Sequence, residues 1–198
     1  MVPTLPTPSY GDNGLFAILA KTRVAATPLE ILNVIRNTRE WEKWNSFCTR
    51  CTIGAEKETI AGADASMLRD EPGWLEVGTK LTTEVFMSGD GLVHGRKKSR
   101  EQAIVVTRIE KLAGDRKGFL IAWKITGWSH WQLHSERVME FVELEDRLTE
   151  YVCWESFGGA LARIVKATVG GTLVDRFGDY ARDVKLFSEN AKGDKVRV

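Results

Sequence analysis

Residues 27–47 read TPLEILNVIRNTREWEKWNSF and predict one amphipathic helix that leads into a strand. Thr27 is a favourable N-cap, a proline follows it at the first helical position, and Glu30 completes a capping box. The branched apolar side chains of the middle turns form a stripe that must be buried against another element. Trp41 and Trp44 lie three residues apart and share a face of the helix. The stretch therefore predicts a helix packed on a sheet, but it does not indicate a function.

The composition is ordinary for a soluble globular protein. The 198 residues, of which 43% are apolar and 28% charged, suffice for one domain with a sizeable core. The net charge of +1 provides no global field that would recruit nucleic acid or an anionic membrane surface. No stretch is long and apolar enough to span a bilayer, and the N-terminus lacks the features of a secretory signal. Three cysteines without framework spacing indicate reduced thiols, so we expect a cytoplasmic protein.

The order of segments predicts an α+β fold. A proline-rich, flexible arm over 1–13 and a C-terminal tail over 193–198 flank a single domain, 14–192. Strand-like segments with turn residues between them occupy 14–26, 47–53, 79–88, 101–112, 118–126, 134–144 and 148–157. Short connections between most of them favour antiparallel pairing.

Two further segments complete the predicted fold. Residues 54–78 read as a long irregular loop with a helical turn near 65–69. Residues 161–190 predict a long helix, which Gly170 and Gly171 bend or pack closely. A curved antiparallel sheet with this helix across its concave face would enclose an internal hydrophobic cavity.

Three local motifs in this order resemble the START-like, or SRPBCC, superfamily with its helix-grip fold. The first runs from Pro28-Leu29-Glu30-Ile31 through Trp41 to Trp44-Asn45-Ser46-Phe47. The second is Trp154-Glu155-Ser156-Phe157-Gly158, and the third is the closing helix with Phe177, Ala181 and Lys185. The resemblance covers about residues 15–190 and includes polyketide cyclases and dehydrases, lipid-transfer domains and birch-pollen-allergen-like proteins. It implies a fold with a ligand cavity but no particular chemistry.

The segment 123–137, WKITGWSHWQLHSER, holds three tryptophans and two of the three histidines of the chain, so its side chains are the most promising for chemistry. By the resemblance it spans a strand end, a loop and the next strand near the mouth of the cavity. His130 and His134 could act as general acid and base, since an imidazole serves either role. The alternative is that both are exposed loop histidines beside packing tryptophans. Relatives often carry histidine at the strand position that Arg137 occupies here.

Strand alternation places further polar groups on faces that also carry apolar ones. Arg137 shares a face with Met139 and Phe141, and it would bind a carboxylate, phenolate or enolate oxygen of a ligand if it points inward. The alternative is a structural ion pair with Glu155. Tyr151 and Glu155 share a face of the last strand, where Glu155 could shuttle protons or anchor the sheet to the final helix.

Two other motifs favour structural readings. Cys48 and Cys51 match C-x-x-C, but they lie in a predicted strand, where residues three apart face opposite sides, so redox or metal use is not expected. The basic run 96–100 could attract phosphates or an acidic partner, although a solvated turn explains it as well. No phosphate-binding loop and no nucleophile elbow is present.

The preferred hypothesis is a cytoplasmic, cofactor-free enzyme of secondary metabolism that resembles polyketide cyclases or dehydrases. As a lyase or isomerase without metal, it would bind a mid-sized hydrophobic, polyketide-like or aromatic molecule and catalyse cyclisation, dehydration or isomerisation. The acid–base and oxyanion candidates are His134, Arg137, Tyr151 and Glu155. The candidates for ligand binding are Phe86, Trp123, Trp128, His130, Trp131, Met139, Phe141, Cys153, Phe157, Phe177 and Tyr180.

Two alternatives need the same fold. A non-catalytic carrier of a lipid, sterol, quinone or pigment would use the cavity without chemistry. A co-chaperone-like interaction module would use its surface and the basic run. We expect no nucleic-acid partner and a monomer or homodimer.

Overall fold

The computed structural model describes residues 1–60, 72–88 and 99–190. The elements follow the chain in this order: β1 (Phe16–Val24), α1 (Pro28–Arg36), the 3-10 helix η1 (Thr38–Glu40), α2 (Trp41–Trp44), β2 (Cys48–Lys57), β3 (Thr79–Phe86), β4 (Ser99–Lys111), β5 (Gly118–Ile125), β6 (His134–Glu145), β7 (Leu148–Gly158) and α3 (Ala162–Asn190). No helix in this part of the chain is long and apolar enough to cross a membrane.

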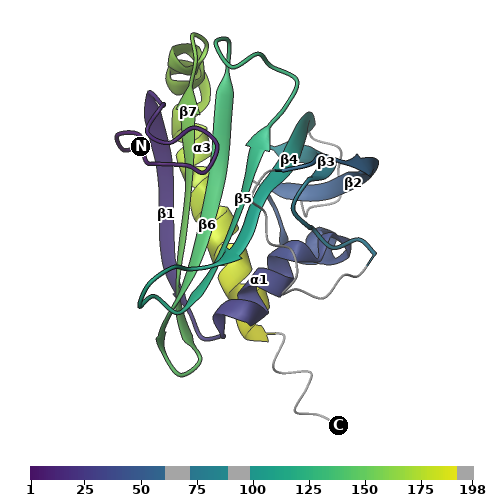
Figure 1. The fold of residues 1–198 in the computed structure, drawn as a ribbon, viewed down its shortest axis with the longest axis vertical. Coiled ribbons are helices and arrows are strands. Elements are labelled where there is room, and N and C mark those ends of the chain that lie inside the picture. The colour runs from purple at the N-terminus through teal and green to yellow at the C-terminus, as the bar shows by residue number, and fades with distance from the viewer. Residues whose placement is uncertain (61–71, 89–98, 191–198) are drawn as a thin grey trace.

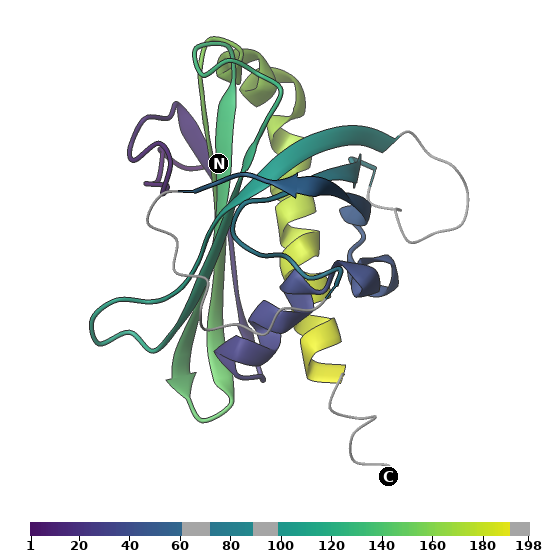
Figure 2. The same cartoon turned by 45° about the vertical axis from the view of Figure 1, so that its right-hand side comes forward.

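Seven antiparallel strands form one curved sheet in the order β1-β7-β6-β5-β4-β3-β2. β1 and β2 are its two edges, so the sheet is not closed. α3 lies in the curve of the sheet, and α1 packs beside the C-terminal part of α3 (Figure 1, Figure 2). The predicted α+β helix-grip architecture, with all its strands and its long closing helix, is confirmed.

The helix predicted over 27–47 is wrong in its length. It begins as expected, because Thr27 and Glu30 form the capping box, but α1 ends at Arg36 and only short helical turns follow. Hydrogen bonds to a distant segment explain the break. The Leu75 amide donates to the Arg36 carbonyl, and the Arg36 Nε donates to the Leu75 carbonyl. The Thr38 amide and hydroxyl both donate to the Gly73 carbonyl. Tertiary pairing thus replaces the continuation of the helix.

The closing helix runs without interruption from Ala162 to Asn190, with a change of direction near its first third (Figure 2). Gly170 is buried there, and a Cβ at this position would lie 2.9 Å from the Met1 sulfur. The glycine therefore permits close packing of the N-terminus on α3. The predicted loop 54–78 is shorter than expected, because β2 extends to Lys57. The predicted turn near 65–69 lies outside the described residues.

The N-terminal arm, which the sequence predicts to be flexible, is tied to the outer face of the sheet. The Ser156 hydroxyl donates to the Leu5 carbonyl (2.6 Å) and accepts from the Leu5 amide (3.1 Å), and the Trp154 indole donates to the Pro6 carbonyl (3.0 Å). These contacts are polar and come from an irregular segment, so no periodic pattern of apolar residues in the sequence predicts them. The tail 193–198 lies outside the described residues.

Glu136 is the buried centre of this attachment. Its carboxylate accepts hydrogen bonds from the Ser9 amide (2.6 Å), the Ser9 hydroxyl (2.9 Å) and the Thr107 hydroxyl (2.5 Å). Three donors converge on one anion that is fully inaccessible to solvent. A buried carboxylate is stable only when its lone pairs are used in this way.

Replacement of this carboxylate should release the arm. In Glu136→Gln the amide has one acceptor oxygen and places an NH2 group against a donor, so we expect unfolding free energy to fall by about 1–3 kcal/mol. Urea unfolding measures the loss, and limited proteolysis near Ser9 reports detachment. Glu140→Gln is the control, because Glu140 lies on the same face and pairs with the exposed Arg116. Equal effects of the two substitutions would contradict the anchoring role.

Candidate functional site

The concave side of the sheet holds two connected hollows. The larger one, here called the outer cleft, has a volume of about 580 Å³ between the N-terminal half of α3 and strands β3 to β7. This volume lies within the range of small-molecule sites. Its apolar walls include Val85, Met87, Ile125, Leu161, Val165 and Leu173.

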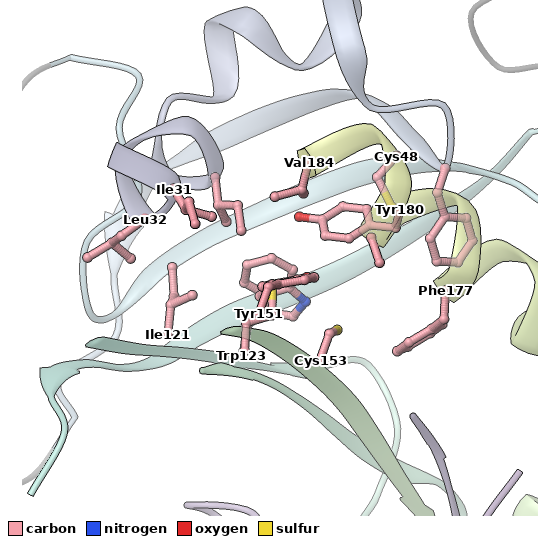
Figure 3. Packing of buried hydrophobic residues seen from close by; sticks show 14 of the residues in the cluster. Ile31, Leu32, Cys48, Ile121, Trp123, Tyr151, Cys153, Phe177, Tyr180 and Val184 are labelled. Atoms are coloured by element: carbon pink, nitrogen blue, oxygen red, sulfur yellow. The ribbon is translucent and has the colours of Figure 1, made fainter. Parts of the chain in front are cut away.

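A smaller hollow, the inner chamber, lies deeper and has a volume of about 50 Å³. Its walls include Trp41, Asn45, Cys48, Ile104, Trp123 and Tyr180. Figure 3 shows that Tyr180 and Phe177 project from α3 toward the sheet. Trp123 and Cys153 project from the strands toward them. The two hollows share six lining residues, which are Phe47, Val85, Gln102, Ile125, Arg137 and Glu155.

An ion pair occupies the junction of the two hollows. Arg137 and Glu155 are direct cross-strand partners on β6 and β7, and only 7% and 8% of their surfaces are exposed. The Arg137 Nε and Nη2 atoms both lie 3.0 Å from Glu155 Oε2. The Ser135 hydroxyl donates to the other oxygen, Oε1, over 2.6 Å. The carboxylate is thus held by three donors on the face that β6 and β7 present to α3.

Four aromatic rings surround the guanidinium group of Arg137. Its Cζ atom lies 4.3 Å from the Phe177 ring centroid, 5.2 Å from Phe47, 5.6 Å from Tyr180 and 5.9 Å from Trp123. These distances are in the range of cation–π attraction. The rings come from α3, from β5 and from the residue before β2, so the charge links distant parts of the chain.

The guanidinium group keeps one hydrogen-bond donor for a ligand. Among the described residues, Arg137 Nη1 has no protein hydrogen-bond partner, and the residue lines both hollows. Burial is the largest single influence on this group and opposes its charge, but Glu155, together with Cys153, Cys48 and Tyr180, outweighs burial and raises the pKa of Arg137 above its ordinary value. The site therefore presents a permanent cation to any oxygen that enters the junction.

The alternative of a structural ion pair between Arg137 and a carboxylate is confirmed, with Glu155 as the partner. The structure also places Arg137 in the lining of both hollows, a direction that the sequence left open. The predicted alternative that Glu155 anchors the sheet to the final helix lacks a direct contact, because its hydrogen bonds go to Ser135 and Arg137 on β6. An inward-facing ion pair is at once a structural element and a recognition element.

Tyr151 lies farther along the same face, and it lines neither hollow. Its side chain is fully buried and stacks on Phe141, with ring centroids 5.6 Å apart. Burial and the thiol of Cys153 raise the pKa of Tyr151 well above its ordinary value. The predicted catalytic position of Tyr151 in the cavity is wrong, because its ring is packed among core residues and reaches neither hollow.

His134 lies on the opposite face of the sheet from Arg137, since the two residues are three positions apart on β6 and successive side chains alternate between faces. Its ring nitrogens lie 2.7 Å from the His130 carbonyl oxygen and 2.8 Å from the Asn13 carbonyl oxygen. A Cβ on Gly158 would lie 2.2 Å from His134 Nε2, so the glycine makes room for the ring. His134 fixes the arm and the preceding loop, and its predicted place among cavity acids and bases is wrong.

The predicted ligand-binding residues separate into several groups. Trp123 and Tyr180 line the inner chamber, Trp128 and Phe157 line the outer cleft, and Phe177 contacts Arg137.

The other predicted contacts lie elsewhere. Met139, Phe141 and Cys153 are core residues outside both linings, whereas Trp131 is 69% exposed. His130 stacks on His134 at the surface, with ring centroids 4.0 Å apart. Phe86 follows the lining residue Val85, so strand alternation turns it away from the cavity. Of the basic run, residues 96–98 lie outside the described residues.

Several polar residues that line the hollows were not predicted from the sequence, among them Asn45, Gln102 and Ser135. Ser135 shares the parity of Arg137 on β6, so a strand register would have indicated it. Asn45 and Gln102 come from a loop and from β4, and only the folded arrangement brings them to the chamber. Among the described residues, no group of three or more His, Cys, Asp or Glu side chains is arranged to hold a metal ion.

No protein-family model matches the chain. A protein of Penicillium oxalicum, described as oxopyrrolidines biosynthesis cluster protein O, is 26% identical over 186 residues, covering 88% of this chain and 87% of that protein. A hypothetical protein from Helicobacter pylori has a similar structure, with a TM-score of 0.65, 12% identity, and coverage of 95% of this chain and 97% of that chain.

The Zhui aromatase/cyclase from a Streptomyces species matches with a TM-score of 0.53 at 13% identity, covering 88% of this chain and 93% of that chain. The chain therefore has the helix-grip fold, an antiparallel sheet curved around a long helix, as these solved structures do. The fold expected from the motifs in residues 28–47 and 154–158 is thereby confirmed. Identities this low do not transfer a reaction or a ligand.

The ion pair makes a prediction about stability. Arg137→Met leaves Glu155 buried without its cation, so we expect a loss of about 3–5 kcal/mol in unfolding free energy. The double substitution Arg137→Met/Glu155→Gln removes both charges and should cost less than the single one. Urea unfolding of the two variants measures the difference. A double variant no more stable than the single one would contradict the pairing.

The buried thiols make a prediction about pH. Burial, opposed by Arg137, raises the pKa of Cys48 and Cys153 from 9.0 to about 11. Between these values the unfolded chain has lost protons that the folded protein still binds, so stability must fall as pH rises from about 9 to 11, by about 2–5 kcal/mol. Urea unfolding at several pH values measures this fall. Cys153→Ala should flatten it, and an equal fall in this variant would contradict the assignment.

Proposed function

We propose that the protein binds a mid-sized hydrophobic, polyketide-like or aromatic molecule in the outer cleft and holds one of its oxygens with Arg137. The free Nη1 donor of Arg137 carries this proposal, because it lies where the apolar cleft meets the inner chamber. An apolar cleft with a few convergent polar groups is typical of ligand sites. A cation among aromatic rings selects a carboxylate, phenolate or enolate oxygen.

The proposed chemistry is cofactor-free cyclisation, dehydration or isomerisation through an enolate. The Glu155 carboxylate takes a proton from the carbon beside a ligand carbonyl, and the electron pair of that C–H bond moves onto the carbonyl oxygen. Arg137 stabilises the oxygen as its negative charge develops. The enolate then attacks an electrophilic carbon, expels a leaving group or takes a proton back at another position. The cleft orients the reacting atoms and excludes water.

The named comparisons agree with this class of function without establishing it. The Penicillium relative is described as the product of a biosynthesis cluster, and the Streptomyces protein as an aromatase/cyclase. Both descriptions belong to those proteins. They support a role in secondary metabolism for this chain.

A second candidate function is that of a non-catalytic carrier for a lipid, sterol, quinone or pigment. Both Glu155 oxygens already accept hydrogen bonds from Ser135 and Arg137, so the carboxylate is already engaged within the protein. His130 and His134 also lie away from the two hollows. A carrier needs the cleft and the Arg137 donor alone.

The ketone 2-acetonaphthone separates the two functions. We expect the wild-type protein to bind it and to accelerate deuterium incorporation into its methyl group in D2O, measured by NMR. Glu155→Gln should reduce the protein-dependent rate by about 10²–10⁴-fold, the usual contribution of a positioned base. Arg137→Met/Glu155→Gln should weaken binding about tenfold or more through the lost charged donor.

Glu140→Gln, on the outer face of the same strand, serves as the control and should match the wild type. Binding without accelerated exchange would favour the carrier over the enzyme. Unchanged affinity in the folded double variant would reject Arg137 as the anchor and with it both candidates.

A further inference from the structure

Two buried polar groups around the inner chamber lack a hydrogen-bond partner among the described residues. One is the Asn45 side-chain NH2 group, and the other is the Tyr180 hydroxyl. Both residues line the chamber, and 0% and 2% of their surfaces are exposed. Buried polar groups are normally satisfied, because an unmade hydrogen bond costs free energy. Two such groups at one hollow point to a missing acceptor.

The orientation of the Asn45 amide is fixed by its other end. Its Oδ1 atom accepts hydrogen bonds from the Phe47 amide (3.2 Å) and the Cys48 amide (2.8 Å). The oxygen and nitrogen therefore cannot be exchanged without loss of both bonds. The NH2 group is left as a donor at the chamber wall.

Tyr180 supplies the second group from α3. Its hydroxyl points away from the helix into the space above Trp123 (Figure 3). Burial, opposed by Arg137, raises the pKa of Tyr180 well above its ordinary value, so the hydroxyl stays protonated at neutral pH and can donate. The Arg137 Cζ atom lies 5.6 Å from the Tyr180 ring centroid. Arg137 therefore lies beside the Tyr180 ring, and both residues line the chamber together with Asn45.

The volumes decide which part of a ligand each hollow accepts. The inner chamber, at about 50 Å³, is far smaller than the cavity of about 150 Å³ that holds one benzene ring. The outer cleft, at about 580 Å³, has room for fused rings or an extended chain. A ring system thus stays in the outer cleft, and only a small terminal group passes the Arg137 junction.

We propose that the inner chamber is a second polar subsite, in which Asn45 and Tyr180 bind a terminal carbonyl or hydroxyl oxygen while Arg137 holds a first oxygen. This inference rests on the proposed function and narrows its ligand class. Two oxygen acceptors close together at one end of an apolar body describe a 1,3-dicarbonyl compound or its enol. The subsite would favour that end group over a plain alkyl chain, because an alkyl chain leaves both donors unpaired.

Matched probes test the subsite. The two compounds 1-(2-naphthyl)-1,3-butanedione and 1-(2-naphthyl)-1-butanone share a skeleton and differ by the terminal carbonyl group. We expect the wild type to bind the diketone more tightly, and Tyr180→Phe to reduce this preference about fivefold to tenfold, the value of one hydrogen bond. Isothermal titration calorimetry measures the four affinities.

Tyr151→Phe is the control variant. The Tyr151 hydroxyl is also buried, with the Cys153 thiol beside it, but the residue lines neither hollow. Both Tyr→Phe proteins should unfold at the wild-type urea concentration or above it, since each loses a buried hydroxyl group. The preference for the diketone should persist in Tyr151→Phe.

The outcomes separate the two proposals. If both compounds bind through Arg137 but Tyr180→Phe keeps the wild-type preference, the chamber holds only ordered water, and the subsite is rejected while the proposed function stands. If the wild type binds neither compound, the subsite and the proposed function fail together. Loss of the preference in Tyr151→Phe as well as in Tyr180→Phe would also reject the subsite.

Discussion

The Arg137–Glu155 ion pair places two opposite charges at the centre of an otherwise apolar interface between sheet and helix. Burial of either charge alone would cost several kcal/mol, so the pair must be held by further hydrogen bonds and ring contacts. Ser135 satisfies the carboxylate, and rings from α3, β5 and the start of β2 surround the guanidinium group. The pair therefore fixes the relation of β6 and β7 to α3, and it leaves one donor toward the hollows.

The alternation of strand residues separates anchoring from recognition. On β6, Ser135 and Arg137 face α3, whereas His134 and Glu136 face the N-terminal arm. Backbone and hydroxyl groups of the arm pair with His134 and Glu136 on the outer face. The inner face retains unpaired donors. This asymmetry directs any ligand chemistry to the concave side of the sheet.

Much of the fold could be predicted from the sequence, because its signals are local. Strand alternation, turn residues between 79 and 158, and the capping box at Thr27 determine elements without knowledge of the remote chain. The end of α1 could not be predicted, since it depends on hydrogen bonds that the Gly73 carbonyl accepts from Thr38 and the Leu75 amide donates to Arg36. The contacts of the arm are likewise non-local and polar, and they leave no periodic pattern.

The candidate site could be predicted only in part. Strand parity gives the shared face of Arg137, Met139 and Phe141 and puts His134 on the other face, but it does not say which face points inward. The pairing of Arg137 with Glu155 depends on the register of β6 on β7. The division into a cleft and a chamber depends on how α3 crosses the sheet. No pattern of residues gives the unpaired groups of Asn45 and Tyr180.

A crystal structure of the protein with 1-(2-naphthyl)-1,3-butanedione tests the central claim most directly, because it locates the ligand oxygens. The account predicts the naphthyl ring in the outer cleft and one oxygen within about 3.2 Å of Arg137 Nη1, with the Arg137–Glu155 pair retained. A ligand bound elsewhere, or one bound in the cleft with its oxygens turned toward solvent, would contradict it.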